Sequence, residues 1–192
     1  MKFSLVAAVL GAAALAACGS TPPPAPVPQA APTTTTTVTV PGADPAAWFD
    51  AYCGPMGVTQ LARRDIPSKA APGPEAMRTA VVGWAQLTAT SGRKMADDLE
   101  KLGPLGSDVQ NPHERLVKAL RDEAKRFDEA AVRLQAERAD AKFPERYEQI
   151  MISVASENAQ ALFKQIVDVP KYGEAFRANQ VCLGWQELAR GN

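Results

Sequence analysis

From Asp44 to the C-terminus, apolar residues recur at steps of three and four, which is the period of an amphipathic α-helix. Asp44-Pro45 places an acid at the N-cap and a proline at the first helical position, so a helix is expected to begin there. We expect Gly54-Pro55 to break or kink this helix, which then resumes over 61–64. Its apolar positions are Trp48, Phe49, Tyr52, Cys53 and Met56.

Two long helices are predicted next. The prolines in 66–73 indicate a loop, and Pro74-Glu75 begins a helix that ends at Gly103-Pro104, a common stop signal. Asn111 is the expected N-cap of the following helix, with Pro112 at its first position and the acid of a capping box after it. The apolar stripes of these two helices are Met77, Val81, Trp84, Leu87, Met95, Leu99 and Leu102, and Leu116, Leu120, Phe127, Ala131 and Leu134.

The last third of the chain predicts one long and one short helix. Phe143-Pro144 begins a fourth helix that runs to Ile166, Pro170 interrupts it, and a shorter fifth helix carries Tyr172 to Leu188. No segment shows sustained alternation with a period of two. The pattern therefore predicts an all-α domain over 44–192, an antiparallel bundle of four to five helices.

The first 43 residues have a different pattern. An apolar stretch of about twelve residues follows Lys2, too short to span about 30 Å of hydrocarbon, so 1–17 are predicted to be a signal peptide. This stretch ends in Leu15-Ala16-Ala17-Cys18, which resembles the lipobox of bacterial lipoproteins. The resemblance implies that Cys18 becomes a diacylated N-terminus, so the membrane is a partner through a lipid anchor on its outer face. The alternative is an ordinary Ala-x-Ala cleavage site followed by an incidental cysteine.

Residues 18–43 read as a stalk. They contain no charged side chain and are rich in proline and threonine, so they cannot bury apolar area and favour polyproline II. Fully extended, they reach roughly 75 Å. Such stalks resemble those of actinobacterial envelope lipoproteins, and the resemblance implies O-glycosylation of the tract Thr33, Thr34, Thr35, Thr36 and Thr37.

The charges are balanced, with 21 basic and 21 acidic side chains, and all except Lys2 lie from Asp44 onward. A balanced domain has no excess positive field for nucleic acid, so no nucleic-acid partner is expected.

The lipobox accounts for Cys18, which leaves Cys53 and Cys182. Because an exported chain lies in an oxidising compartment, these two are expected to pair and to join the N- and C-terminal helices. The alternatives are free thiols or metal ligands. The chain has no CxxC motif and a single histidine, so soft ligands for zinc are few and no metal site is expected.

Recognisable catalytic groups are scarce. His113 is the only histidine, and near a helix N-terminus it is expected to be partly exposed rather than a base or ligand. The acids at 97–100, 122–123 and 128–129 alternate with Lys and Arg, which is typical of solvated helix faces. We expect no cofactor and no enzymatic activity.

Two functional hypotheses remain. The first is a non-enzymatic, lipid-anchored envelope protein whose helical domain interacts with an envelope protein or component. The alternative is a binding module for an apolar ligand such as a lipid or haem; an axial ligand to haem iron would have to come from His113, Tyr52, Tyr147 or Tyr172. If an apolar pocket exists, we expect it between the second helix and the disulfide-linked end helices, with Trp84 and Trp185 facing each other.

Overall fold

The computed structural model of the chain describes residues 42–154 and 158–190. These residues form helices joined by short connections, with no strand among them, so the all-α prediction is confirmed. The signal peptide, Cys18, the stalk and Thr33–Thr37 lie outside the described residues. In the part that the structure describes, none of the helices combines the length and the apolar character that crossing a bilayer requires.

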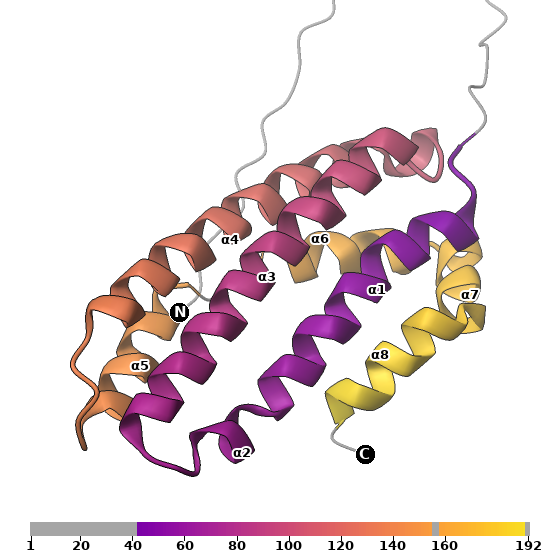
Figure 1. Ribbon diagram of the computed structural model, residues 1–192. Coiled ribbons are helices and arrows are strands. Elements are labelled where there is room, and N and C mark those ends of the chain that lie inside the picture. Colours follow the sequence, from indigo (N-terminus) through magenta and orange to yellow (C-terminus); the bar gives the residue numbers. More distant parts are fainter. Residues whose placement is uncertain (1–41, 155–157, 191–192) are drawn as a thin grey trace, which may run out of the picture. The chain divides into compact units, whose positions relative to one another are not determined.

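The helix bounds are as follows (Figure 1): α1 Pro45–Arg64, α2 Ile66–Ala70, α3 Pro74–Leu102, the 3₁₀ turn η1 Ser107–Val109, α4 Gln110–Ala136, α5 Phe143–Ile152, α6 Asn158–Val167, α7 Pro170–Ala178 and α8 Gln180–Arg190.

Helix α1 begins as predicted but is longer than predicted. The Asp44 carboxylate accepts a hydrogen bond of 3.1 Å from the backbone N–H of Ala47, and Pro45 takes the first helical position. The helix continues through Pro55 to Arg64, so the expected break at Gly54-Pro55 is wrong. A proline inside a helix costs about 3 kcal/mol, but residues on both sides of Pro55 are buried, and this packing offsets the cost. The predicted loop after it contains the short helix α2, anchored by the buried Ile66.

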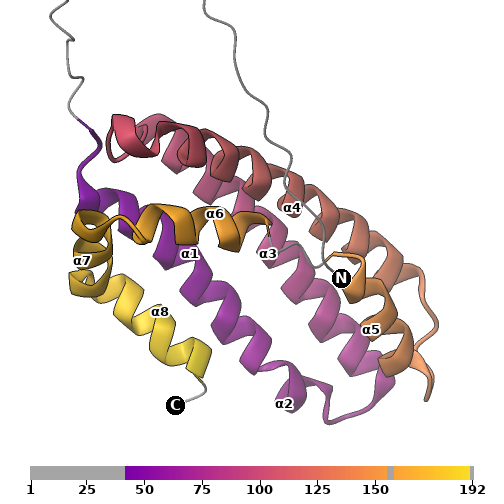
Figure 2. The same cartoon turned by 180° about the vertical axis from the view of Figure 1, so that it is seen from behind.

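Helices α3 and α4 lie side by side as an antiparallel pair and make the most extensive contact between two elements (Figures 1 and 2). Helix α3 ends at Gly103, whose φ of 77° favours glycine, as the stop signal predicts. The two backbones approach closely at Gly92, where a Cβ atom would lie 3.3 Å from the Cβ of Ala124. The start of α4 differs from the prediction. It begins at Gln110, directly after η1, because the buried Val109 turns the chain into the helix before Asn111 is reached.

The predicted fourth and fifth helices are each divided. Helix α5 ends at Ile152, where the Ser153 hydroxyl donates a hydrogen bond of 2.6 Å to the Ile150 carbonyl and so competes with the helical pattern. Helix α7 begins at Pro170 as predicted, but it ends before Asn179, whose backbone is extended. The side-chain oxygen of Asn179 accepts a hydrogen bond of 2.9 Å from the N–H of Cys182 and caps α8.

Buried side chains form two clusters. The disulfide-side cluster joins α1, α6, α7 and α8 to the later half of α3 and the early half of α4, and contains Trp48, Phe49, Tyr52, Cys53, Leu99, Leu116, Phe163, Ile166 and Cys182. The α5-side cluster joins α2 and α5 to the other halves of α3 and α4, and contains Ile66, Val81, Ala85, Phe127, Ala131, Leu134, Phe143 and Ile150. The two clusters occupy opposite ends of the α3–α4 pair.

Candidate ligand-binding cavity

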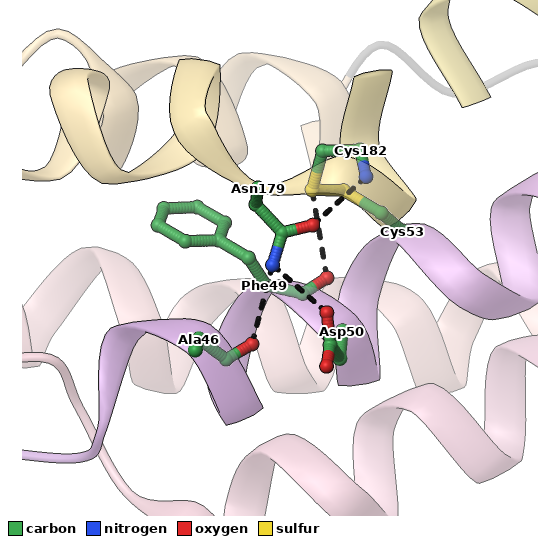
Figure 3. Close-up of a disulfide and its surroundings, with 6 residues drawn as sticks. All are labelled: Ala46, Phe49, Asp50, Cys53, Asn179 and Cys182. Carbon is green, nitrogen blue, oxygen red and sulfur yellow. Dashed lines mark hydrogen bonds between the residues drawn. A yellow bond between two sulfur atoms is a disulfide. The ribbon is translucent and has the colours of Figure 1, made fainter. Parts of the chain in front are cut away.

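The predicted disulfide between Cys53 and Cys182 is present and connects α1 to α8 (Figure 3). Both cysteines are fully buried, and the Cys182 sulfur lies 3.6 Å from the Phe49 carbonyl oxygen. Asn179 strengthens the same junction, because its side-chain NH₂ donates to the Asp50 carboxylate at 2.8 Å and to the Ala46 carbonyl at 3.4 Å (Figure 3). These contacts fix the first turn of α8 against α1.

Aromatic rings from α1, α6, α7 and α8 pack next to this junction. The rings of Tyr52 and Phe163 are stacked with centroids 3.9 Å apart, and Trp48 lies parallel to Tyr52 at 6.2 Å. Trp185 of α8 meets Tyr52 edge to face at 6.1 Å, and Phe176 of α7 meets Phe163 in the same way at 5.3 Å. Such offset and edge contacts add to the free energy gained by burial. The stack therefore holds α1, α6, α7 and α8 in a defined arrangement.

A cavity of about 640 Å³ opens beside the aromatic stack. Its walls come from α1, α3, α4, α6, α7 and α8, and they are mainly apolar. The volume is within the range of about 300–1,000 Å³ that is usual for small-molecule sites. The apolar walls include Met56, Met95, Leu120, Phe127, Phe163 and Trp185.

Glu123 brings a carboxyl group to this cavity. Burial raises the pKa of Glu123 because it disfavours the ionised form, and the more distant charge of Arg126 opposes the rise. Burial also raises the pKa of Tyr52, and the nearby Glu123 adds to that effect. The neighbouring acids Asp122 and Glu129 pair with Lys118 and Lys125, whereas Glu123 forms no ion pair with any described residue.

The two cations that line the cavity have other contacts. The Arg63 guanidinium lies 5.9 Å from the centre of the Trp84 ring, and the Lys164 ammonium pairs with Asp168 at 2.6 Å. Two further lining residues, Trp185 and Gln186, have side-chain nitrogens that are buried without a hydrogen-bond partner in the described chain. The cavity thus combines apolar walls with a carboxyl group that has no ion-pair partner among the described residues.

The structure does not bring Trp84 and Trp185 together. Trp185 lines the cavity, whereas Trp84 packs against the α5-side cluster, where it meets Phe127 edge to face at 5.5 Å. Trp84 lies outside the cavity because of its position along α3. The α3 residues that line the cavity lie between Thr88 and Met95, and Trp84 is one turn earlier.

His113 is buried rather than partly exposed, so that expectation is wrong. Its side chain is 4% exposed, and its Nδ1 accepts a hydrogen bond of 3.4 Å from the indole N–H of Trp48. His113 lies three residues before Leu116 and seven before Leu120, so it shares their buried stripe and faces the disulfide-side cluster. Burial lowers the pKa of His113, and the charge of Glu114 opposes this effect.

Most of the predicted solvated acids are confirmed as exposed ion pairs. Arg121 of α4 bonds to both Asp97 and Glu100 of α3, at 2.9 and 2.7 Å, and other acids pair along their own helices. Glu123 is the exception, because its carboxyl group faces the cavity. A signal for this was present in the sequence: Glu123 lies three residues after Leu120 and four before Phe127, which places it at the edge of the buried stripe.

Among the described residues, no group of three or more His, Cys, Asp or Glu side chains is arranged to hold a metal ion. No protein-family model, curated protein or solved structure matches the chain.

Proposed function

We propose that this chain is a lipid-anchored protein of the cell envelope whose helical domain binds an apolar or amphiphilic small molecule in the cavity beside Tyr52 and Glu123. One observation carries the proposal: a cavity of about 640 Å³ with apolar walls contains a carboxyl group that has no cationic partner among the described residues. We take its scaffold to be an antiparallel bundle in which α1, α3, α4 and the α5–α6 segment are the main members.

The chemistry of the walls supports binding of a small molecule rather than catalysis. Apolar and aromatic surface stabilises a ligand by removing its apolar area from water, at about 25 cal/mol per Å². A few polar groups then orient the ligand, and the Glu123 carboxyl is the charged group at this site without an ion-pair partner among the described residues. This arrangement favours the apolar-ligand hypothesis over docking of an envelope protein.

The N-terminal sequence supports the envelope location. A diacylated Cys18 would bury two chains in the membrane at about 0.8 kcal/mol per CH₂, which is enough for stable anchoring. The stalk would then extend the binding domain away from the bilayer. Cys18→Ala is expected to release the protein or leave it uncleaved, and processed Cys18→Ala protein that still partitions into detergent would contradict the lipobox assignment.

Haem has less support than an amphiphile. Of the four side chains considered as axial ligands, only Tyr52 lines the cavity. Burial and Glu123 both raise the pKa of Tyr52, whereas a tyrosine ligand to ferric iron binds as the phenolate.

The binding function can be tested on the mature chain, residues 18–192, with Cys18→Ser so that no acyl chain is attached. Native mass spectrometry of this chain after incubation with an envelope lipid extract is expected to show a retained small molecule at one equivalent. Ser91→Phe should abolish retention, because Ser91 is 9% exposed and lines the cavity, so the ring would occupy the ligand volume.

The matched control is Thr90→Phe, which places the same ring on the exposed side of α3 and should leave retention unchanged. A clean apo mass, together with no saturable binding of any amphiphile, would overturn the proposal. Equal retention by the Ser91→Phe variant would show that the molecule binds elsewhere.

A further inference from the structure

The charged residues that line the cavity determine whether a cationic or an anionic amphiphile is favoured. Glu123 is the only acid among the lining residues, and no described side chain neutralises it at ion-pair distance. Of the lining cations, Lys164 pairs with Asp168, and Arg63 lies over the ring of Trp84. Arg126 weakens the field of the Glu123 carboxylate but lies beyond ion-pair distance, so a ligand head that contacts Glu123 meets a carboxylate that no contacting cation neutralises.

We propose that the cavity takes an amphiphile with a positively charged ammonium head, which pairs with the Glu123 carboxylate while its apolar tail lies against the aromatic and methionine walls. This inference rests on the proposed binding function and assigns the ligand class of the same site. A fatty acid would place a second carboxylate beside Glu123, which is unfavourable in a site with little water.

The aromatic walls favour the same class of ligand. Phe127 of α4 and Trp185 of α8 both line the cavity, and aromatic faces attract alkylammonium groups within about 6 Å. Tyr52 and Phe163 are stacked on each other, so they offer the cavity mainly ring edges and apolar area. The thioether side chains of Met56 and Met95 are flexible and can adapt to an alkyl tail.

The protonation of Glu123 couples ligand binding to pH. Burial disfavours the ionised carboxylate in the empty cavity, and a bound cation would restore it, so a proton should leave as the ligand binds. The other charged or titratable groups that face this region are Tyr52 and Arg63 from α1, Arg126 from α4 and Lys164 from α6. The affinity for a quaternary ammonium, whose own charge is constant, should therefore rise with pH as Glu123 ionises.

The test is isothermal titration calorimetry of the mature Cys18→Ser chain with two probes of the same chain length, each below its micellar concentration: decyltrimethylammonium and decanoate. At pH 7 we expect decyltrimethylammonium to bind at one site, more tightly than decanoate by about tenfold or more. Its affinity should fall as the pH is lowered toward 4.

Glu123→Gln keeps the size of the side chain and removes its charge. It should abolish both the preference for the ammonium and the pH dependence, while decanoate binds no more weakly than to the wild type. Glu129→Gln is the matched control, since it removes an exposed acid from the same helix and should change neither.

The outcomes separate the two proposals. Equal or tighter binding of decanoate, or a preference that survives Glu123→Gln, would overturn the ammonium assignment while leaving the cavity as a site for an apolar ligand. Failure of both probes to bind, together with an apo mass after incubation with the lipid extract, would overturn the proposed function itself.

Discussion

The two clusters of buried residues share the helix pair α3 and α4, but different elements cover them. The α5-side cluster is packed between α3, α4 and α5, and its central residues Leu134 and Phe143 are fully buried. The disulfide-side cluster depends on short C-terminal segments, and α8 packs mainly against α1. It also borders the cavity. The disulfide side has the larger set of buried side chains and still leaves space for a ligand, whereas the α5-side cluster is the smaller core.

Among the changes on the cavity side, removal of the Cys53–Cys182 disulfide should cause the largest loss of stability. It closes a loop with a sequence separation of 129, for which the chain-entropy model gives about 4–5 kcal/mol. Cys53→Ser is therefore expected to lower the melting temperature by roughly 10 °C or more, because about 1 kcal/mol corresponds to 2–4 °C in a domain of this size. Thermal melts with and without reductant measure this, and equal melting temperatures would count against a structural role for the bridge.

Truncation of side chains should separate the two clusters next. Leu134→Ala in the α5-side cluster should cost about 2–5 kcal/mol, because it opens a cavity in a closed core. Met56→Ala at the wall of the existing cavity should cost less than about 1 kcal/mol, since Met56 is only partly buried. Urea denaturation gives both values, and similar losses would show that the clusters are equally packed.

Removing the buried carboxyl group should stabilise the empty protein. Because the folded-state pKa of Glu123 is raised, its contribution to stability is present below the unfolded value of about 4.3 and is lost as pH rises through the folded value. At pH 7, Glu123→Gln should therefore increase the free energy of unfolding. The control Glu129→Gln should be neutral, and a destabilised Glu123→Gln variant would mean that the carboxylate is favourably solvated in the native state.

His113 should make a smaller contribution, in the opposite direction with pH. Burial lowers its pKa, so its contribution is present above the unfolded value of about 6.5 and is lost as the pH falls below it toward the folded value. Protonation of Nδ1 would also remove the acceptor for the Trp48 N–H. Denaturation between pH 7 and 5 should show this loss, and His113→Phe should reduce the slope; an unchanged slope would place the titration on another group.

The smallest effect is expected on the exposed face. Arg121→Ala removes the ion pairs with Asp97 and Glu100, whose side chains are more than half exposed, and should change the stability only slightly. The loss should shrink further at high salt. A larger loss that does not depend on salt would show that the alkyl part of Arg121 contributes to packing between α3 and α4.

The sequence predicted the fold class because its information is local. The apolar period predicts helices, Asp44 and Gly103 mark two of their ends, and two cysteines in an exported chain pair. The errors arose where tertiary packing overrides local signals. Pro55 is tolerated inside α1, and Asn179, which looked like part of a continuous helix, divides the last helix by capping α8.

The cavity was only partly predictable. Trp185 lines it without the predicted partner Trp84, since the disulfide brings α8 against α1 but does not bring the early part of α3 to the same place. Glu123 was missed because its i+3 neighbour Arg126 suggested an ordinary solvated pair. Whether a side chain at the edge of a buried stripe meets water or a cavity depends on the placement of α6 and α8, and this placement follows from long-range packing rather than from periodicity.

The disulfide side of the domain is open for a ligand, and the α5 side is not. Hydrogen exchange of the mature chain, recorded with and without saturating decyltrimethylammonium, tests this difference most directly. We predict increased protection in α6 and α8, which line the cavity, and no change in α5, with the effect lost in the Ser91→Phe variant. Protection that is absent, or that is equal in α5 and α8, would contradict the account.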